Sequence, residues 1–399
     1  MSALLKKPRE GLAIGLLAIG QTISWAGIYY LFAALLLSWE RDTGWSKPEI
    51  TLALTLAVLT SGLAAPIAGR LIDRGYGPLM MGLCTAAGGA AAALLSLTTS
   101  LMGFYAVWIL IGIAQAGALY EACFAVVARA KGPAARQGIT AITLAGGFAS
   151  AIAFSGAAWL GKEMDWTWVA VLFGGITALI AAPASWFGAR LIEGCSETPT
   201  EASSSPRGDR VAPFALLLLL AATFPMMALN HGIILNHLLP LLDSRDIAPQ
   251  TAVLAASLIG PMQVAGRLAI MIAGARITSL AAVLISFAGV VAAALILLVS
   301  SAAPGLIFVS VILQGATYGL ISILKPVIIA EFSGPAGIAR VLGWMALPYL
   351  GCFALAPYLG ALIWTVGGYD LVLLAAAGFA FVGFMAMALA AWLRRRYAL

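Results

Sequence analysis

The sequence predicts an all-α integral membrane protein, and three observations support this. Of the 399 residues, 62% are hydrophobic and only 10% are charged, and the mean hydropathy is +1.02. A soluble domain is normally about half apolar and a quarter charged, so this chain has too few charges for a water-facing surface. Its apolar residues also gather in runs of about 20 or more, the length a helix needs to cross a bilayer. Soluble, collagen-like and disordered chains are therefore excluded.

Twelve runs are long enough to span a membrane, and they form two sets of six. They lie near 11–37, 49–71, 78–98, 101–128, 137–160 and 166–190, and near 213–242, 249–272, 277–300, 305–330, 340–365 and 370–393. The extended polar stretch between the sets is rich in Ser, Pro and charge, which is typical of a flexible linker. We expect an N-terminal six-helix bundle at 1–192, a cytoplasmic linker at 193–212 and a C-terminal six-helix bundle at 213–399.

The basic residues predict the orientation. The first run follows Lys6, Lys7 and Arg9 and is too long for the apolar region of a signal peptide, so we interpret it as a span. With the N-terminus inside, 16 of the 22 Lys and Arg residues fall on the cytoplasmic side and four fall outside. Short cytoplasmic loops carry this excess in membrane proteins, so both termini are expected inside and nucleic-acid binding is not expected.

The two halves repeat weakly. The fourth run contains Gln115 and Tyr120, and the tenth contains Gln314 and Tyr318, about half the chain away. Gly27-Ile28 and Gly232-Ile233 share a similar offset. A common offset favours duplicated halves related by an axis along the membrane normal.

The loop after the second run carries a motif. It reads Gly69-Arg-Leu-Ile-Asp73-Arg74, which is similar to the G-x-x-x-D-R motif of the major facilitator superfamily, although the following glycine is displaced to Gly75 and Gly77. The resemblance covers the whole chain and implies the major facilitator fold. It also implies a gating role for Gly69, Asp73 and Arg74, in which Asp73 caps a helix and pairs with a basic residue.

A finer resemblance rests on the Gly44-Trp45-Ser46 and Gly266-Arg267-Leu268 segments and on the start of the tenth run. These look most like bacterial relatives of the monocarboxylate and oxalate/formate porters. The resemblance implies a bacterial cytoplasmic (inner) membrane and a substrate carboxylate held by Arg267. Monocarboxylate porters often have an Asp four residues before that Arg, and this chain has Gln263 at that position.

Three charges are placed at membrane depth, where an ionisable group is costly. Arg267 offers a planar fork that matches a carboxylate, or it forms a structural ion pair. Glu121, expected to be buried, could load and release a proton or serve as a fixed partner for Arg267 or Lys325. Lys325 could act in transport or extend its long stem to the interface, which is the default for such a residue.

Neutral candidates complete the predicted site. Hydroxyl, amide and imidazole groups on the first, fourth, seventh, eighth and tenth runs could orient a substrate or carry a proton. The predicted substrate-binding set is Arg267, Tyr120, Tyr29, Tyr318, His231, Asn230 and Gln263, and the proton-coupling set is Glu121 and His231. His231 and His237 are six residues apart and face different sides of a helix, so we expect no metal, and no cofactor.

The leading hypothesis is a secondary transporter that moves a small organic anion, a mono- or dicarboxylate, by alternating access. Proton symport is the preferred mechanism, and anion exchange remains an alternative. The expected partners are the anion, protons and the lipid bilayer, and the chain is expected to be a monomer. Efflux of a drug or amphipathic metabolite is the alternative. A polytopic membrane enzyme is a remote one, because the chain lacks an HExxH motif and a catalytic triad. No phosphate-binding loop is present for an ATP-driven pump.

Overall fold

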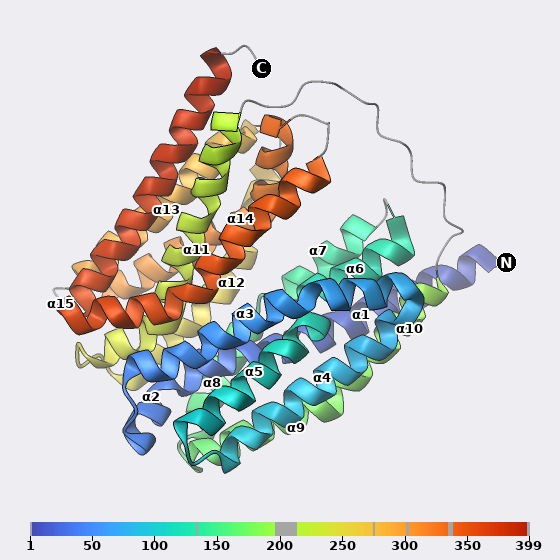
Figure 1. Cartoon of the computed structure of the whole chain (residues 1–399), viewed down its shortest axis with the longest axis horizontal. Coiled ribbons are helices and arrows are strands. Elements are labelled where there is room, and N and C mark those ends of the chain that lie inside the picture. The colour runs from blue at the N-terminus through green and yellow to red at the C-terminus, as the bar shows by residue number, and fades with distance from the viewer. Residues whose placement is uncertain are drawn as a thin grey trace. The chain divides into compact units, whose positions relative to one another are not determined.

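The computed structural model describes residues 2–132, 135–195, 214–273, 276–300, 303–333 and 338–396, which are helical apart from short connections. The chain divides into two compact units, Met1–Ala202 and Ser203–Leu399 (Figure 1). Of the expected linker at 193–212, Glu193 and Gly194 still belong to a helix and Cys195 follows it, whereas 196–212 lie outside the described residues.

The long helices of the N-terminal unit run side by side (Figure 1). Its elements are α1 (Ser2–Trp25), η1 (Ala26–Tyr30), α2 (Leu31–Thr43), α3 (Lys47–Leu71), η2 (Ile72–Tyr76), α4 (Gly77–Leu94), η3 (Leu95–Leu97), α5 (Leu101–Ala118), α6 (Tyr120–Lys131), α7 (Ala135–Gly146), α8 (Ala149–Leu160), α9 (Trp166–Ile176), η5 (Thr177–Ala181) and α10 (Ala182–Gly194). Helix α4 contacts α5, α9 and α10, and α1 contacts α10 and α7. Most of the predicted runs are therefore interrupted in this unit.

Local sequence explains where α3 begins. Ser46 is its N-cap: the Glu49 amide donates to Ser46 Oγ at 3.4 Å, and the Ser46 amide donates to Glu49 Oε2 at 2.8 Å. This capping box satisfies amides that the first turn of a helix leaves without partners. Together with Gly44, which ends α2 in a left-handed conformation at φ 71°, it fixes the connection between the two helices.

The C-terminal unit has five helices in the described residues: α11 (Phe214–Asp243), α12 (Pro249–Ala273), α13 (Ser279–Leu298), α14 (Gly305–Ser333) and α15 (Ile338–Arg396). Helix α11 packs on α15, and α14 packs on both α12 and α13. Helix α15 folds back on itself (Figure 1) at Gly367 and Gly368, where the backbone is not helical.

Ten stretches among the described residues are long and apolar enough to cross a membrane. Two of them, Lys47–Leu97 and Leu347–Arg396, have 51 and 50 residues, more than twice the length of one crossing. Each contains a break, at Gly75 in the first and at Gly367–Gly368 in the second. Counting two crossings for each gives twelve, so the all-α, multi-pass membrane architecture predicted from the sequence is confirmed.

Candidate functional site

The first span of the N-terminal unit contains a π-helical turn. Residues Ala26–Tyr30 form η1 between α1 and α2, so the regular pattern of helical hydrogen bonds is shifted there. Gln115 of α5, itself buried, donates from Nε2 to the Ile28 carbonyl at 2.6 Å. Single π-turns of this kind occur often at functional sites in helices. Of the two consecutive tyrosines in this turn, Tyr29 is buried and Tyr30 is half-buried.

The fourth span is broken at Leu119. Its backbone is extended, with φ −88° and ψ −167°, so α5 ends at Ala118 and α6 begins at Tyr120. Gln21 of α1 donates from Nε2 to the Ala118 carbonyl at 2.7 Å, which satisfies an acceptor at the end of α5. Glu121 therefore lies in the first turn of a helix, where the helix dipole favours a negative charge.

The expectation that Glu121 is buried is wrong. Its side chain is exposed, whereas Ala122 and Cys123 beside it are buried. The break at Leu119 explains this exposure. Because α6 begins a new helix there, the direction of the Glu121 side chain does not follow from the helical periodicity of α5. The carboxylate thus lies on the surface of its unit.

Aromatic side chains gather around these two breaks. We call them the aromatic cluster: Trp25, Tyr29, Tyr30, Tyr120, Phe124 and Phe154. The Trp25 ring centroid lies 5.0 Å from that of Tyr29 and 4.9 Å from that of Tyr120, and Tyr120 stacks on Phe124. The Tyr120 hydroxyl occupies the place where a Cβ at Gly146 would stand, so this approach requires glycine. The predicted residues Tyr29 and Tyr120 are therefore brought together.

The C-terminal unit holds a corresponding arrangement on α11 and α14. Gln314 donates from Nε2 to Asn230 Oδ1 at 2.9 Å, and Asn230 donates from Nδ2 to the Ala376 carbonyl at 3.0 Å. All three groups are buried. Asn230 is thus a structural link between α11, α14 and α15.

A continuous row of side chains begins one residue further on. The His231 and Tyr318 rings are stacked, with centroids 3.4 Å apart and an angle of 8° between the planes. The Tyr318 and Tyr349 hydroxyls are 3.1 Å apart, and the Lys325 ammonium lies 3.7 Å from the Tyr349 ring centroid. We call these four residues the polar row. His231 Nδ1 is buried and has no hydrogen-bond partner among the described residues.

The polar row gives Lys325 a contact that the sequence does not predict. Its ammonium makes a cation–π contact with Tyr349 within the unit, and the expected reach of its stem to the membrane interface stays a prediction. The side chain is half-buried. Tyr349, which sequence analysis does not find, is the residue that holds it.

Arg267 is buried, with 9% of its side chain exposed. Its Nε donates to the Gly319 carbonyl of α14 at 3.0 Å, one residue after Tyr318. The predicted neighbour Gln263 is also buried, on the same helix α12. The guanidinium is therefore oriented by a carbonyl of α14 that directly follows Tyr318 of the polar row.

His237 has a structural contact. Its Nε2 lies 2.8 Å from the Pro357 carbonyl of α15, and its ring packs against Gly360. It therefore joins α11 to α15, apart from the stack formed by His231.

The loop expected to act as a gate forms η2, between α3 and α4. Asp73 and Arg74 are exposed, and Gly75 has φ 87°, a conformation that favours glycine. Arg129 donates from Nη1 to the Ile72 carbonyl at 2.7 Å and to Glu193 Oε1 at 3.3 Å. The Arg129–Glu193 ion pair therefore lies beside this loop, and the gating role of Asp73 stays a prediction.

The remaining gate residue is Gly69, in the last turn of α3. Apart from its chain neighbours and the backbone of its own helix, no described atom lies within 4 Å of the place where its Cβ would stand. Contacts within this unit therefore do not explain a glycine at this position.

Several residues of both arrangements were not predicted from the sequence. Gln115 and Gln314 could have been found, because their repeated offset marks equivalent positions. Trp25 lies one helical turn before Tyr29, which is a weaker signal. Nothing in the sequence indicates Tyr349, because its role depends on the approach of α15 to α14.

Comparison with known proteins identifies the family. The Major Facilitator Superfamily model matches residues 17–301, more than two thirds of the chain. No curated protein matches the sequence at a significant level.

Several solved structures share the fold. The chain is similar to the nucleoside transporter NupG (TM-score 0.69, 13% identity, covering 96% of this chain and 98% of NupG). It is similar to the human organic anion transporter MFSD10 (TM-score 0.63, 19% identity, 95% and 99% covered). It is also similar to a D-xylose–proton symporter (TM-score 0.67, 12% identity, 95% and 96% covered). The chain therefore belongs to the major facilitator superfamily: it is a multi-pass secondary transporter of a small molecule and not an enzyme.

Proposed function

We propose that the protein transports a small organic anion, a mono- or dicarboxylate, coupled to protons. The observation that carries this is the charge within the C-terminal unit. Arg267 and Lys325 lie within helices and are buried or half-buried, and both are close in sequence or space to the hydroxyls of Tyr318 and Tyr349. Cations and neutral donors at membrane depth favour an anionic ligand.

The acidic residues of the same unit lie elsewhere along the sequence than these cations. Residues 214–396 contain four acids, and all lie at helix ends or beside a kink. Asp243 ends α11 and Asp246 follows it; Glu331 accepts from Ser279 Oγ at 2.7 Å near the end of α14; Asp370 pairs with Arg245 at 2.7 Å next to the α15 kink. A negatively charged substrate would bring negative charge to parts of these helices where the sequence has no acidic residue.

Arg267 is our candidate for the carboxylate anchor. The bond from Nε to the Gly319 carbonyl fixes the plane of the guanidinium. A fixed, planar fork matches the two oxygens of a carboxylate, which an ammonium group cannot do. Tyr318, Asn230 and Gln263 are then neutral groups on the flanking helices that would orient the anion.

Glu121 and His231 are the candidates for proton coupling. Glu121 is the acid of residues 9–195 that lies furthest from a span end, and its exposed carboxyl is open to exchange protons. His231 presents a buried ring nitrogen without a partner among the described residues, and imidazole can take or give a proton near neutral pH.

The test is uptake of labelled mono- and dicarboxylates by proteoliposomes, with and without an inward proton gradient. We expect the gradient to drive uptake. Arg267→Ala and Arg267→Lys should both reduce uptake by about tenfold or more, because a charge-assisted bidentate contact is lost. Arg276→Gln, at the exposed side chain after the same helix, is the matched control and should transport normally. Normal transport by both Arg267 variants would exclude the anchor.

Efflux of an amphipathic drug or metabolite is the second candidate, favoured by the aromatic cluster. Its rings offer flat apolar surface with phenol groups at the edge, which suits an amphipathic ligand. A broad export phenotype in cells, with no carboxylate uptake in proteoliposomes, would select this function instead.

A further inference from the structure

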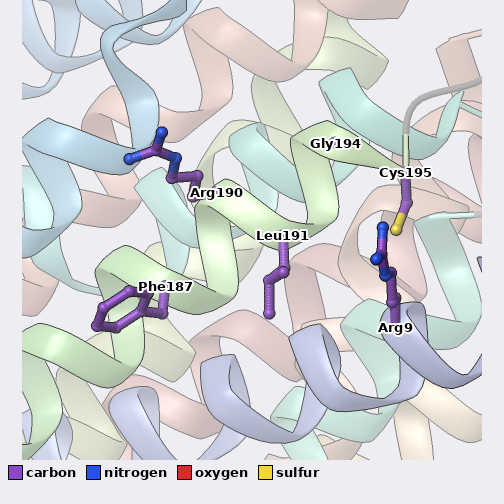
Figure 2. A pocket seen from close by; sticks show the side chains of 6 residues that line it. All are labelled: Arg9, Phe187, Arg190, Leu191, Gly194 and Cys195. Carbon is purple, nitrogen blue, oxygen red and sulfur yellow. The ribbon is translucent and has the colours of Figure 1, made fainter.

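A surface pocket lies on the N-terminal unit, apart from the aromatic cluster and from the gate loop. Its volume is about 350 Å³, and it is lined by Arg9, Phe187, Arg190, Leu191, Gly194 and Cys195. Arg9 lies on α1 and the other residues lie on α10 or directly after it. Figure 2 shows Arg9 beside Cys195 at one end of the pocket and Phe187 at the other.

The pocket lies at one end of the bundle. It is formed by the first part of α1 and the last part of α10, which pack closely because Gly188 lets Leu17 and Ala13 approach. The expected orientation places this end at the cytoplasmic face, where the headgroups of the inner leaflet are. The pocket is therefore expected at the boundary between the lipid headgroups and the acyl chains.

The pocket is positively charged. Arg9 and Arg190 are exposed, and no acidic residue lines it. The acids closest in sequence have other partners: Glu10 pairs with Lys131 at 2.8 Å, and Glu193 pairs with Arg129 at 3.3 Å. Among the described residues, the contact found for Arg190 is the Trp186 ring, 5.8 Å from the guanidinium carbon. Both guanidinium groups can therefore serve an external anion.

The same pocket also has an apolar side. The Phe187 ring is 49% exposed although it belongs to a membrane-spanning stretch, and Leu191 is half-buried between the two arginines. A soluble anion would not need this surface. A molecule that joins a negative headgroup to an acyl chain matches both sides.

We propose that this pocket binds an anionic glycerophospholipid of the cytoplasmic leaflet. The negatively charged headgroup lies at the Arg9 end of the pocket, Arg190 adds positive charge to the pocket, and an acyl chain lies against Phe187 and Leu191. Basic pockets beside membrane helices recognise such headgroups through charge-assisted hydrogen bonds. The bound lipid would join α1 to α10 at the end where the chain leaves the N-terminal unit. This proposal is independent of the transported substrate.

The test uses the purified full-length protein in detergent. Binding is measured by native mass spectrometry and by the melting temperature, with added phosphatidylglycerol, phosphatidylcholine or glycerol 3-phosphate. We expect phosphatidylglycerol adducts and a rise in melting temperature, because only the folded protein binds, and no such rise with the other two. Arg9→Gln/Arg190→Gln should weaken phosphatidylglycerol binding by about tenfold or more. Arg70→Gln, an exposed arginine at the end of α3, should not.

A second variant keeps both guanidinium groups. Phe187→Ala should weaken phosphatidylglycerol binding while leaving the melting temperature in phosphatidylcholine unchanged, because about half of this residue is exposed. Equal phosphatidylglycerol binding by the wild type and the double arginine variant would overturn the site. A full shift with glycerol 3-phosphate alone would overturn the lipid assignment in favour of a soluble anion.

Discussion

Two buried glutamines show how single side chains hold the helices of each unit together. Gln115 donates to the Ile28 carbonyl in η1, and Gln314 donates to Asn230 Oδ1 on α11. In each half, therefore, the fourth helix of the bundle reaches the first through an amide. A buried amide is costly without a partner, so each bond fixes the relation of two helices.

Replacing Gln115 tests this at a single position. Gln115→Leu would leave the Ile28 carbonyl without its side-chain donor, at a cost of about 1–3 kcal/mol. We expect a melting temperature lower by about 2–4 °C for each kcal/mol lost, measured by nano-scale fluorimetry in detergent. Gln137→Leu, at an exposed position of α7, is the control and should change little. An unchanged melting temperature for Gln115→Leu would show that this bond does not stabilise the fold.

The hydroxyl contact within the polar row can be measured by a double-mutant cycle. Tyr318→Phe and Tyr349→Phe each remove one partner of the 3.1 Å contact while keeping the rings that face His231 and Lys325. We expect each to cost about 1 kcal/mol and the double variant to cost no more than one single change. Unfolding of the purified variants gives these values. Tyr318→Phe combined with Tyr358→Phe is the control pair, and its losses of stability should add. If the losses for Tyr318→Phe and Tyr349→Phe also added, the hydroxyls of Tyr318 and Tyr349 would not be coupled.

At the scale of single residues, the sequence predicted which charged residues lie within membrane spans, but it did not predict which side chains they contact. Arg267 was predicted at membrane depth because its run is otherwise apolar, and the structure finds it buried. Lys325 and Glu121 were predicted in the same way, yet one lies over Tyr349 and the other is exposed. Their surroundings depend on residues from α15 and on the break at Leu119, which hydropathy does not record.

At the scale of elements, hydrophobic runs locate spans but not the breaks within them. The runs at 11–37 and 101–128 were each expected as one helix, and the structure divides them at η1 and Leu119. A shift of backbone hydrogen bonds leaves the apolar composition unchanged, so periodicity cannot show it. The breaks still have a sequence correlate, since Gln21 and Gln115 provide the donors that satisfy the nearby carbonyls.

The loop η2 allows a test of one element. Gly75 has φ 87°, so Gly75→Ala should be destabilised by about 1–2 kcal/mol, whereas Gly75→Asn should lose less because Asn tolerates this conformation better. The space is open, since the closest neighbours of a Cβ here are the Arg129 amino groups at 3.7 and 3.8 Å. Melting temperatures of the two variants provide the comparison. If Ala and Asn were equally tolerated, backbone strain would not be the reason for this glycine.

At the scale of the whole molecule, the sequence predicts two duplicated halves, and residues at equivalent positions of the two halves make similar contacts. The offset between Gln115 and Gln314 is 199 residues and that between Tyr120 and Tyr318 is 198, obtained by subtracting the residue numbers. In each unit the glutamine bonds to the first helix and the tyrosine packs on an aromatic ring of that helix, Trp25 or His231. The chemistry has diverged, with an indole in one unit and an imidazole in the other. The repeat therefore predicts where site residues lie but not which groups they carry.

The orientation of the whole chain is the last prediction. The excess of Lys and Arg places the end of α3 at Arg70 inside and the loop containing Lys162 outside, and both side chains are exposed. In intact cells, Lys162→Cys should therefore react with a membrane-impermeant maleimide, whereas Arg70→Cys should react only after permeabilisation. The wild type is the control for the native cysteines, of which Cys123 and Cys195 are buried and Cys84 and Cys352 are partly buried. The reverse labelling pattern would invert the topology and would place the arginine pocket of α1 and α10 at the outer leaflet.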